Sequence, residues 1–324
     1  MYFLFRRKAT GIYLFSVLSM KKFTRETLIF LLPLIISVFL MEFLLRQIPN
    51  DYQYKKKYLD NNSDKIEILF LGNSHAFYGL NPKYCKQHCF NASYITQSFD
   101  LDLEILKKYE QKWSELKIIV IPVSYFSFIE SLNTSSESWR IKNYIIYYGI
   151  KASKVLKYYT EVLSNNLSIN LKRITSYYIK GNSAITCTDL GWGFSYNSKN
   201  HQDLIETGKE AAVRHTIKDY KDFNENVSTL KSIIAFGQRH NIKIVLFTPP
   251  AFETYIKILN KEQLEKTIKA AENISQQYGN CLYYNLLDNK AFIESDFYDA
   301  DHLNEIGAEK LTILIENMIS EKIK

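Results

Sequence analysis

The chain has 324 residues, of which 46% are hydrophobic and 15% aromatic, and its formal net charge is +7. Six of the 41 lysine and arginine residues lie within the first 25 positions, where no acidic residue occurs, and the other 35 stand against 34 acidic residues. This length is enough for one large domain with its own core. The near-neutral remainder argues against a basic face for nucleic acid.

The first predicted element is a membrane-spanning helix over residues 28–45. Its sequence, LIFLLPLIISVFLMEFLL, has about the length that a bilayer core requires, and Glu42 is its one charged residue. Basic residues precede the apolar stretch, so the positive-inside rule places the N-terminus in the cytoplasm and everything after Arg46 on the other side of the membrane. These basic residues are Lys21, Lys22 and Arg25.

This reading divides the N-terminal part into a cytoplasmic segment (1–26), an anchor (27–46) and a polar juxtamembrane stalk (47–64). Met20 resembles a natural start for such an anchor. A cleaved signal peptide fits less well, because the apolar stretch is long and no small-residue cleavage site follows it. A buried core helix is the remaining alternative.

Residues 65–324 alternate short apolar runs with helical patterns. Continuous apolar strands between helices are typical of a parallel sheet that is covered on both faces, which predicts an α/β fold with five parallel strands. The predicted strands are 66–71, 89–94, 117–124, 242–249 and 281–287. The predicted helices are 102–113, 219–240, 261–278 and 304–322.

Residues 125–215 interrupt this alternation and are rich in Tyr, Ser and Asn. We interpret them as a helical and loop insertion at the C-terminal side of the sheet, where open α/β folds build their binding sites. The four cysteines show no zinc-like spacing. Cys85 and Cys89 are close enough in sequence to form a disulfide, and unpaired thiols are the alternative.

Two short motifs indicate nucleophilic catalysis. Gly72-Asn73-Ser74 directly follows the first apolar run, and Asp299 and His302 stand just before the last helical pattern. A serine hydroxyl needs a base, and a base works best when a third group orients it. We therefore expect His302 to contact Ser74 and Asp299 to hold the other ring nitrogen, while the Asp301 side chain points elsewhere.

The two motifs together resemble those of the SGNH/GDSL hydrolase superfamily, in particular a membrane-anchored bacterial branch with relatives in cell-surface polysaccharide acylation. The resemblance extends over residues 66–319. It implies a three-layer α/β/α sandwich, with Ser74 as nucleophile, His302 as base and Asp299 as its partner. Asn73 takes the position of the Asp in the family's G-D-S block.

The family's middle motifs, which supply a glycine and an asparagine to the oxyanion hole, are not present. Candidates for this role are the backbone N–H groups of Ser74 and Ser98, and the side chains of Gln97 and Ser124. Losing one such donor costs about 10²–10³-fold in kcat, so a weak or inactive member is a real alternative.

Other polar and aromatic residues are candidates for substrate contact. Trp192 and Tyr196 would stack on a sugar ring, and His215 would meet the substrate, although packed-loop and solvated-helix roles are the alternatives. His75 is expected to have a packing or helix-terminal role. The Asp299, Asp301 and His302 stretch lacks a partner cluster for a metal, so we expect no metal and no cofactor.

The sequence thus predicts a single-pass membrane protein with an extracytoplasmic serine esterase or O-acyltransferase domain. Its substrate would be an acylated, most simply acetylated, cell-surface polysaccharide. Expected partners are this glycan, the bilayer through residues 28–45, and membrane proteins of polysaccharide biosynthesis. The alternative is an inactive member that binds glycan or assembles with the export machinery.

Overall fold

A five-stranded sheet, parallel throughout, forms the centre of the fold. The structure is a computed structural model that describes residues 2–322 and the side chains of residues 20–321. The strands lie in the order β2-β1-β3-β4-β5, and each of the five predicted apolar runs contains one. Their bounds are β1 (Ile68–Phe70), β2 (Cys89–Asn91), β3 (Ile118–Pro122), β4 (Lys243–Thr248) and β5 (Cys281–Asn285).

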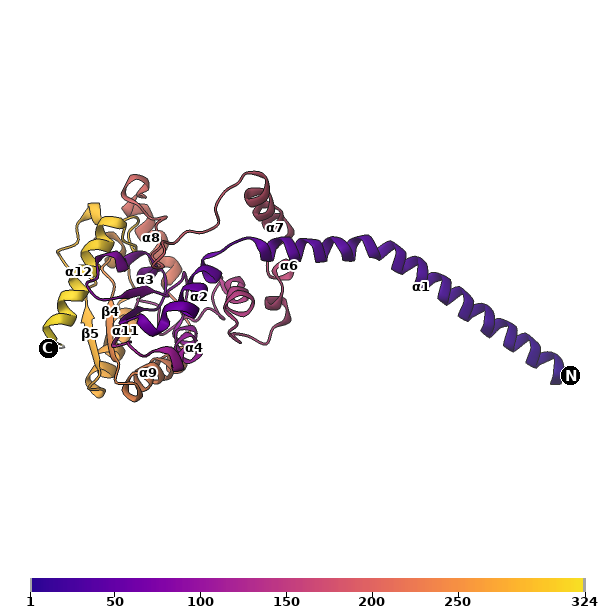
Figure 1. The fold of residues 1–324 in the computed structure, drawn as a ribbon, viewed down its shortest axis with the longest axis horizontal. Helices are drawn as coiled ribbons and strands as arrows, with labels where there is room; N and C mark the ends of the chain where they lie inside the picture. Colours follow the sequence, from indigo (N-terminus) through magenta and orange to yellow (C-terminus); the bar gives the residue numbers. More distant parts are fainter. Residues whose placement is uncertain (1, 323–324) are drawn as a thin grey trace. The chain divides into compact units, whose positions relative to one another are not determined.

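Helices cover both faces of this sheet (Figure 1). Successive strand residues point to opposite faces, so Leu69 packs in one apolar cluster while Ile68 and Phe70 pack in the other. The first cluster includes α2 (Asp51–Asn62), α4 (Phe99–Lys108), α9 (Phe223–Arg239) and α11 (Lys261–Gln277); the second includes α3 (Ser74–Gly79) and α12 (Glu305–Lys322). The expected three-layer α/β/α fold is confirmed.

Residues 51–62, which were expected to belong to a polar stalk, form α2 within the folded domain. Tyr52, Lys55 and Leu59 are buried on one face of this helix. The Lys55 ammonium donates to the Ser93 carbonyl at 2.5 Å and lies 4.4 Å from the ring centre of Phe77. A lysine at the middle of the buried face hid the apolar pattern, and the stalk prediction was wrong for this segment.

The chain divides into two compact units. One consists of residues 49–159 and 183–324, which hold the sheet and its helices. The other consists of residues 1–48 and 160–182. The predicted insertion at 125–215 is therefore not a single body. Its helices are α5 (Ile141–Asn143), α6 (Glu161–Ser164), α7 (Leu167–Ile174) and α8 (Leu204–His215), and α10 (Glu253–Ile256) follows β4.

The N-terminal helix α1 (Tyr2–Gln47) contains the predicted span. Its residues 20–47 form the one helix, among those the structure describes, that is long and apolar enough to cross a membrane, with a mean hydropathy of 2.7. Membrane anchors and signal sequences share this length and composition. A translation start at Met20 stays a prediction.

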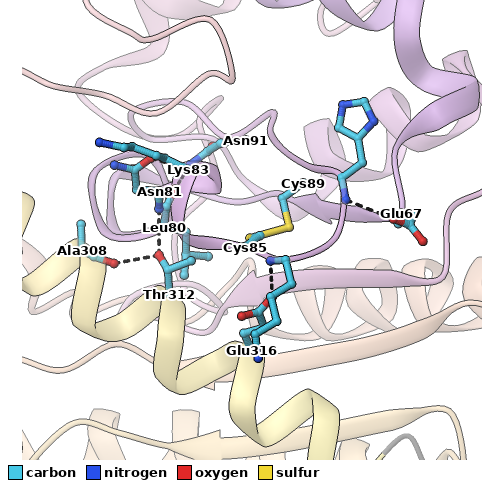
Figure 2. Close-up of a disulfide and its surroundings, with 12 residues drawn as sticks. Glu67, Leu80, Asn81, Lys83, Cys85, Cys89, Asn91, Ala308, Thr312 and Glu316 are labelled. Carbon is cyan, nitrogen blue, oxygen red and sulfur yellow. Dashed lines mark hydrogen bonds between the residues drawn. A yellow bond between two sulfur atoms is a disulfide. The ribbon is translucent and has the colours of Figure 1, made fainter.

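A disulfide joins Cys85 to Cys89 (Figure 2). Cys187 and Cys281 are buried free thiols. The disulfide closes the loop between α3 and β2. The same loop is tied to α12, where the Thr312 hydroxyl accepts the Asn81 N–H at 2.9 Å. These contacts fix the connection that follows α3, the helix that begins at Ser74.

Candidate active site

Ser74 stands at a sharp turn between β1 and α3. Gly72 has a φ of +103°, and a Cβ built on it would lie 2.5 Å from the Pro122 ring, so glycine is required there. The Gly72 N–H donates to the buried Asp102 carboxylate at 2.9 Å. Asn73 then caps α3, because its side-chain oxygen accepts the His75 N–H at 3.1 Å. The turn leaves Ser74 as the first residue of the helix.

The loop before α12 is shaped by Asp299. One oxygen of this carboxylate accepts the backbone N–H of Asp301 at 3.1 Å and that of His302 at 2.8 Å. Asp and Asn side chains often fold a loop back on itself in this way. Asn304 ends the loop, since its side-chain oxygen accepts the Ile306 N–H at 2.9 Å at the start of α12. The His302 ring is thereby held at a defined position.

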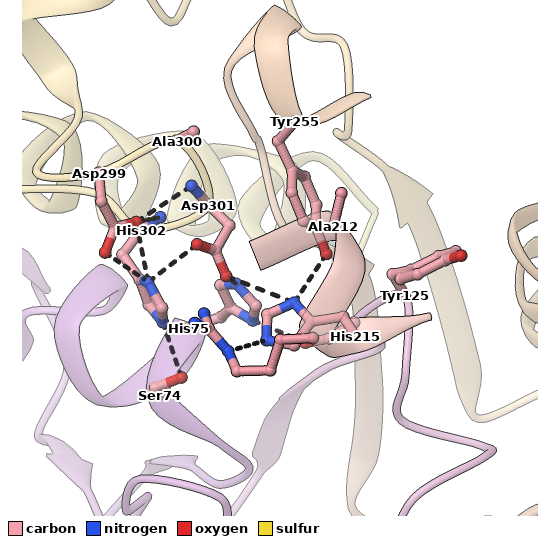
Figure 3. A network of polar contacts seen from close by, with 12 residues as sticks. Ser74, His75, Tyr125, Ala212, His215, Tyr255, Asp299, Ala300, Asp301 and His302 are labelled. Atoms are coloured by element: carbon pink, nitrogen blue, oxygen red, sulfur yellow. Dashed lines mark hydrogen bonds and ion pairs between the residues drawn. The ribbon is translucent and has the colours of Figure 1, made fainter. Parts of the chain in front are cut away.

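The two motifs meet in space as the sequence predicts (Figure 3). The Ser74 Oγ lies 2.9 Å from His302 Nε2, and His302 Nδ1 lies 3.0 Å from Asp299 Oδ1. A hydroxyl, an imidazole and a carboxylate in this order can move the serine proton to the ring while the carboxylate orients it. The contacts are confirmed, and the catalytic roles stay predictions.

These residues open onto a cavity of about 590 Å³. Its lining is largely polar, with charged side chains from the segment that follows β3 and from α8. These are Glu130, Glu137, Arg140, Glu210 and Arg214. Tyr196 also lines the cavity and stacks between two other tyrosine rings, with centres 3.7 Å from Tyr78 and 3.9 Å from Tyr298. Tyr196 therefore lies at the cavity, and its stacking on a sugar ring stays a prediction.

No family model and no curated protein matches the chain. Three solved structures are similar: a protein provisionally named a platelet activating factor from Streptococcus pneumonia, a provisionally assigned acylhydrolase from Bacteroides fragilis, and a GDSL-like lipase from Bacteroides thetaiotaomicron. Their identities are 15%, 11% and 11%, and their TM-scores 0.44, 0.40 and 0.39. The matches cover 88%, 85% and 83% of this chain and 98%, 100% and 98% of theirs.

This chain itself has the features that its two motifs led us to expect. Its sheet is parallel, Ser74 follows the first strand, and Asp299 and His302 precede the last helix. The fold is a three-layer α/β/α sandwich around one five-stranded parallel sheet. This agrees with the resemblance that the two sequence motifs indicated.

Both candidate oxyanion side chains, those of Gln97 and Ser124, are engaged elsewhere. Gln97 donates to Asp102 at 2.6 Å and accepts from the Tyr144 hydroxyl at 2.8 Å, beside a smaller cavity that Ser74 does not line. Ser98, a candidate through its backbone N–H, lines the same smaller cavity and not the one that Ser74 lines, and its hydroxyl donates to Asp100. Ser124 is buried and accepts from the Asn73 amide at 2.9 Å. The predicted oxyanion role is wrong for the Gln97 and Ser124 side chains, whose polar atoms hold the surrounding turns.

Trp192 is not a sugar platform. It is buried, and its ring N–H donates to the Tyr78 carbonyl at 2.6 Å. The sequence stretch around it does reach the site, but through Tyr196. The prediction for Trp192 was wrong because an exposed-looking Gly-Trp-Gly loop folds inward against α3.

One residue of the cavity that the sequence analysis missed is Thr96. It has a φ of +59°, and among the described residues only Asn241 is a second non-glycine residue with positive φ. The left-handed region is unfavourable for a β-branched side chain, and such strain gathers at functional sites. No described residue accepts a hydrogen bond from the Thr96 N–H or from the Ser74 N–H. Backbone conformation at residue 96 leaves no mark in the sequence.

Asp301 was expected to point away from the site, and the structure places it at the centre of a histidine cluster (Figure 3). One carboxylate oxygen lies 3.5 Å from His302 Nδ1, and the other lies 3.7 Å from His75 Nε2 and 3.7 Å from His215 Nδ1. Asp301 is almost fully buried, and its Oδ2 has no hydrogen-bond partner. His75 and His215 are thus part of the site's polar network.

The histidines of this cluster differ in protonation. Burial lowers the pKa of His75 and lowers the pKa of His215 to about 3, so both rings are neutral at pH 7. Burial also lowers the pKa of His302, but the Asp299 and Asp301 carboxylates outweigh it and raise that pKa well above its usual value. His302 is therefore charged at neutral pH in the free protein and must lose a proton before it can act as a base.

Metal ligation was not expected, and the structure offers one cluster for it among the described residues. Ligand atoms of His75, Asp301 and His302 lie within 4.8 Å of one another. Both ring nitrogens of His302 are already hydrogen-bonded, to Ser74 and to Asp299. A metal ion at this cluster would have to displace one of these contacts.

Replacing Asp301 with asparagine should move the pH profile of ester hydrolysis to lower pH. The substitution removes one of the two negative charges that favour protonated His302, so the pKa of His302 falls and the base form is present at lower pH. We expect the acidic limb of kcat/KM to shift downward by about one pH unit or more. A limb that does not move, or that moves upward, would show that Asp301 does not act on His302.

Proposed function

We propose that this chain is a membrane-anchored serine esterase or O-acyltransferase that acts on acyl groups of a cell-surface polysaccharide. The observation that carries the proposal is the hydrogen-bonded series Ser74–His302–Asp299, which opens onto a polar cavity. The sequence motifs and the SGNH/GDSL-like fold support the same chemistry.

In the proposed reaction, His302 Nε2 takes the Ser74 proton while Oγ attacks the ester carbonyl carbon. The tetrahedral intermediate collapses as His302 returns the proton to the leaving alcohol oxygen, which leaves an acyl-serine. The oxygen of water or of a sugar hydroxyl then attacks the acyl carbon while His302 takes its proton. The bond from this carbon to Ser74 Oγ breaks, His302 returns the proton to Oγ, and a free acid or a new ester is released. Asp299 stabilises the imidazolium in both half-reactions.

The oxyanion that forms in each half-reaction needs hydrogen-bond donors. The unpartnered N–H groups of Ser74 and Thr96 are the donors that we assign to it, since both residues line the cavity. Backbone donors at a turn cost no reorganisation when the charge develops. This assignment replaces the Gln97 and Ser124 side chains.

The lining of the cavity favours a glycan over a long acyl chain. Carbohydrates are bound by hydrogen-bonding side chains together with aromatic rings, and here charged side chains face the stacked Tyr196 and Tyr298. The proposed reaction requires no acyl group larger than acetyl. The position of α1 before the domain, with basic residues on its N-terminal side, supports an extracytoplasmic location.

A serine-reactive fluorophosphonate tests the proposal directly. The full chain in detergent should be labelled at Ser74, and labelling should disappear after heat denaturation and in the Ser74→Ala variant. The same preparation should release acetate from an acetylated polysaccharide. If the folded protein is neither labelled nor active but binds the glycan, the chain is a glycan-binding module and not an enzyme.

The binding module is the second candidate because of one specific observation. The side chains that could have completed an oxyanion hole, those of Gln97 and Ser124, are committed to structural hydrogen bonds. A chain that relies on two backbone donors alone would show weak turnover. Rapid labelling of Ser74 without sustained acetate release would indicate an enzyme with weak turnover.

A further inference from the structure

The segment at residues 160–182 belongs to the same compact unit as α1 rather than to the catalytic domain (Figure 1). It contains the short helices α6 and α7, followed by a further helical turn at Thr175–Ile179. The predicted insertion at 125–215 includes this segment, and no candidate site residue lies in it. Its contacts with α1 concentrate on the last turns of that helix.

Glu42, the one charged residue inside the predicted span, holds residues 160–182 against α1. Its carboxylate accepts the backbone N–H of Glu161 at 3.1 Å and of Val162 at 2.9 Å, the first residues of α6. Arg46, one turn further along α1, donates to the same carboxylate at 2.6 Å. A buried or lipid-facing carboxylate needs such partners. Glu42 therefore joins α6 to α1.

Further contacts fix α7 in this unit. Arg173 on α7 lies 2.6 Å from the fully buried carboxylate of Glu161 on α6. The Tyr178 hydroxyl donates to the Leu44 carbonyl of α1 at 3.0 Å. The segment is thus held at both of its ends, by an ion pair and by hydrogen bonds.

The outer side of this segment is apolar. Large hydrophobic side chains that the fold leaves exposed are Leu163 (64%), Leu167 (60%), Ile169 (44%), Leu171 (48%), Tyr178 (44%) and Ile179 (77%). Exposed apolar patches of this kind mark interaction surfaces. Lys172 and Lys180 are exposed among them, and no acidic side chain lies between residues 162 and 182.

The height of the segment along α1 indicates what covers it. Residues 28–45 of a helix rise about 27 Å, close to the thickness of a bilayer core. Residues 42–46 then lie at the boundary where the span leaves the membrane, and the exposed apolar residues Phe39 and Phe43 continue along α1 beside the segment's docking point. Apolar side chains interspersed with lysines are typical of helices that lie in the headgroup region.

We propose that residues 160–182 lie in the lipid headgroup region of the bilayer that α1 crosses, with the apolar side chains of α6 and α7 inserted between the acyl chains. This inference rests on α1 being a membrane span, and it is independent of the proposed esterase chemistry. Lys172 and Lys180 face phospholipid phosphates. The protein holds the membrane by one span and one interfacial helix pair.

Depth-dependent quenching of a fluorophore tests this proposal. Single cysteines are introduced by Leu167→Cys, by Leu34→Cys in the middle of α1, and by Val213→Cys, a 74% exposed position on α8 of the catalytic unit. Each full-length variant is labelled in its folded state with an environment-sensitive dye and reconstituted into vesicles that contain lipids brominated at shallow or deep acyl positions. The unsubstituted chain, whose free thiols are buried, sets the background.

We expect shallow bromines to quench the label at position 167 several-fold more than the label at position 213. Deep bromines should quench the label at position 34 most. Quenching at position 34 with none at position 167 overturns this inference and leaves the anchor intact, while no quenching at either position overturns both. Shielding at position 167 that depends on protein concentration instead of brominated lipid would assign the face to a second copy, which also overturns the proposal.

A Glu42→Ala variant tests whether the contact between Glu42 and α6 positions the segment at the membrane, or whether its apolar side chains alone do so. Without the carboxylate, the N-terminus of α6 loses its acceptor, so the label at position 167 should lose much of its shallow quenching. The label at position 34 should be unchanged, because the span itself remains. Unaltered quenching at position 167 would show that Glu42 does not position the segment.

Discussion

Ester hydrolysis by the full chain should fall on the order of 10⁶-fold in kcat when Ser74 is replaced by alanine, because the nucleophile is then absent. His302→Ala should lose activity to about the same degree. The 2.9 Å contact between Ser74 Oγ and His302 Nε2 makes nucleophile and base one unit, so the double variant should be no worse than either single one. The measurement is acetate release, or hydrolysis of a small chromogenic ester, at saturating substrate.

A serine far from the cavity provides the control for this series. Ser232 lies exposed on α9, and Ser232→Ala should keep full activity and the same thermal unfolding temperature. Ser74→Ala should also fold, since its side chain makes no contact that the core requires. If Ser74→Ala keeps its activity, Ser74 is not the nucleophile and the proposed serine mechanism is wrong.

Asp299→Asn should reduce kcat by about 10⁴-fold, a smaller loss than that of Ser74→Ala. The amide that replaces the carboxylate favours the wrong tautomer of His302 and does not stabilise the imidazolium. The loss should be incomplete because the Asp301 carboxylate lies 3.5 Å from the same ring nitrogen. The comparison of kcat values for Asp299→Asn, Asp301→Asn and the double variant measures how far the two carboxylates share this role.

If the double variant loses no more activity than Asp299→Asn alone, Asp301 does not take over the contact with His302 Nδ1. A smaller loss for Asp299→Asn than for Asp301→Asn would reverse the two assignments. In that case the carboxylate at the centre of the histidine cluster, and not the one in the Asp-x-x-His motif, would orient the base.

The sheet and the central pair of motifs could be predicted because local sequence carries them. Buried parallel strands appear as apolar runs, and all five were found, although each observed strand is shorter than its run. The contact between Ser74 and His302 followed from chemistry, since a nucleophile requires a base. The long helices α9, α11 and α12 followed from their apolar periodicity.

The remainder depends on residues that meet only after folding. His75, His215 and Asp301 come from α3, α8 and a C-terminal loop, and no spacing in the sequence shows that they converge. Lys55 was taken for a solvated charge because its buried partners, the Ser93 carbonyl and two aromatic rings, are 22 or more positions away. The sequence likewise gives no sign of the left-handed backbone conformation at Thr96.

The burial of α2 decides where a fragment that lacks α1 but keeps the folded domain can begin. A fragment cut at residue 65, after the expected stalk, would lack Tyr52, which stacks on Tyr94, and Tyr58, which stacks on Phe90. Both of these core rings would then be exposed. The Asn50 side chain caps α2 by accepting the Gln53 N–H at 3.1 Å, so the first usable cut lies before Asn50. For protein production, the boundary between α1, the predicted anchor, and the folded domain is therefore residue 49.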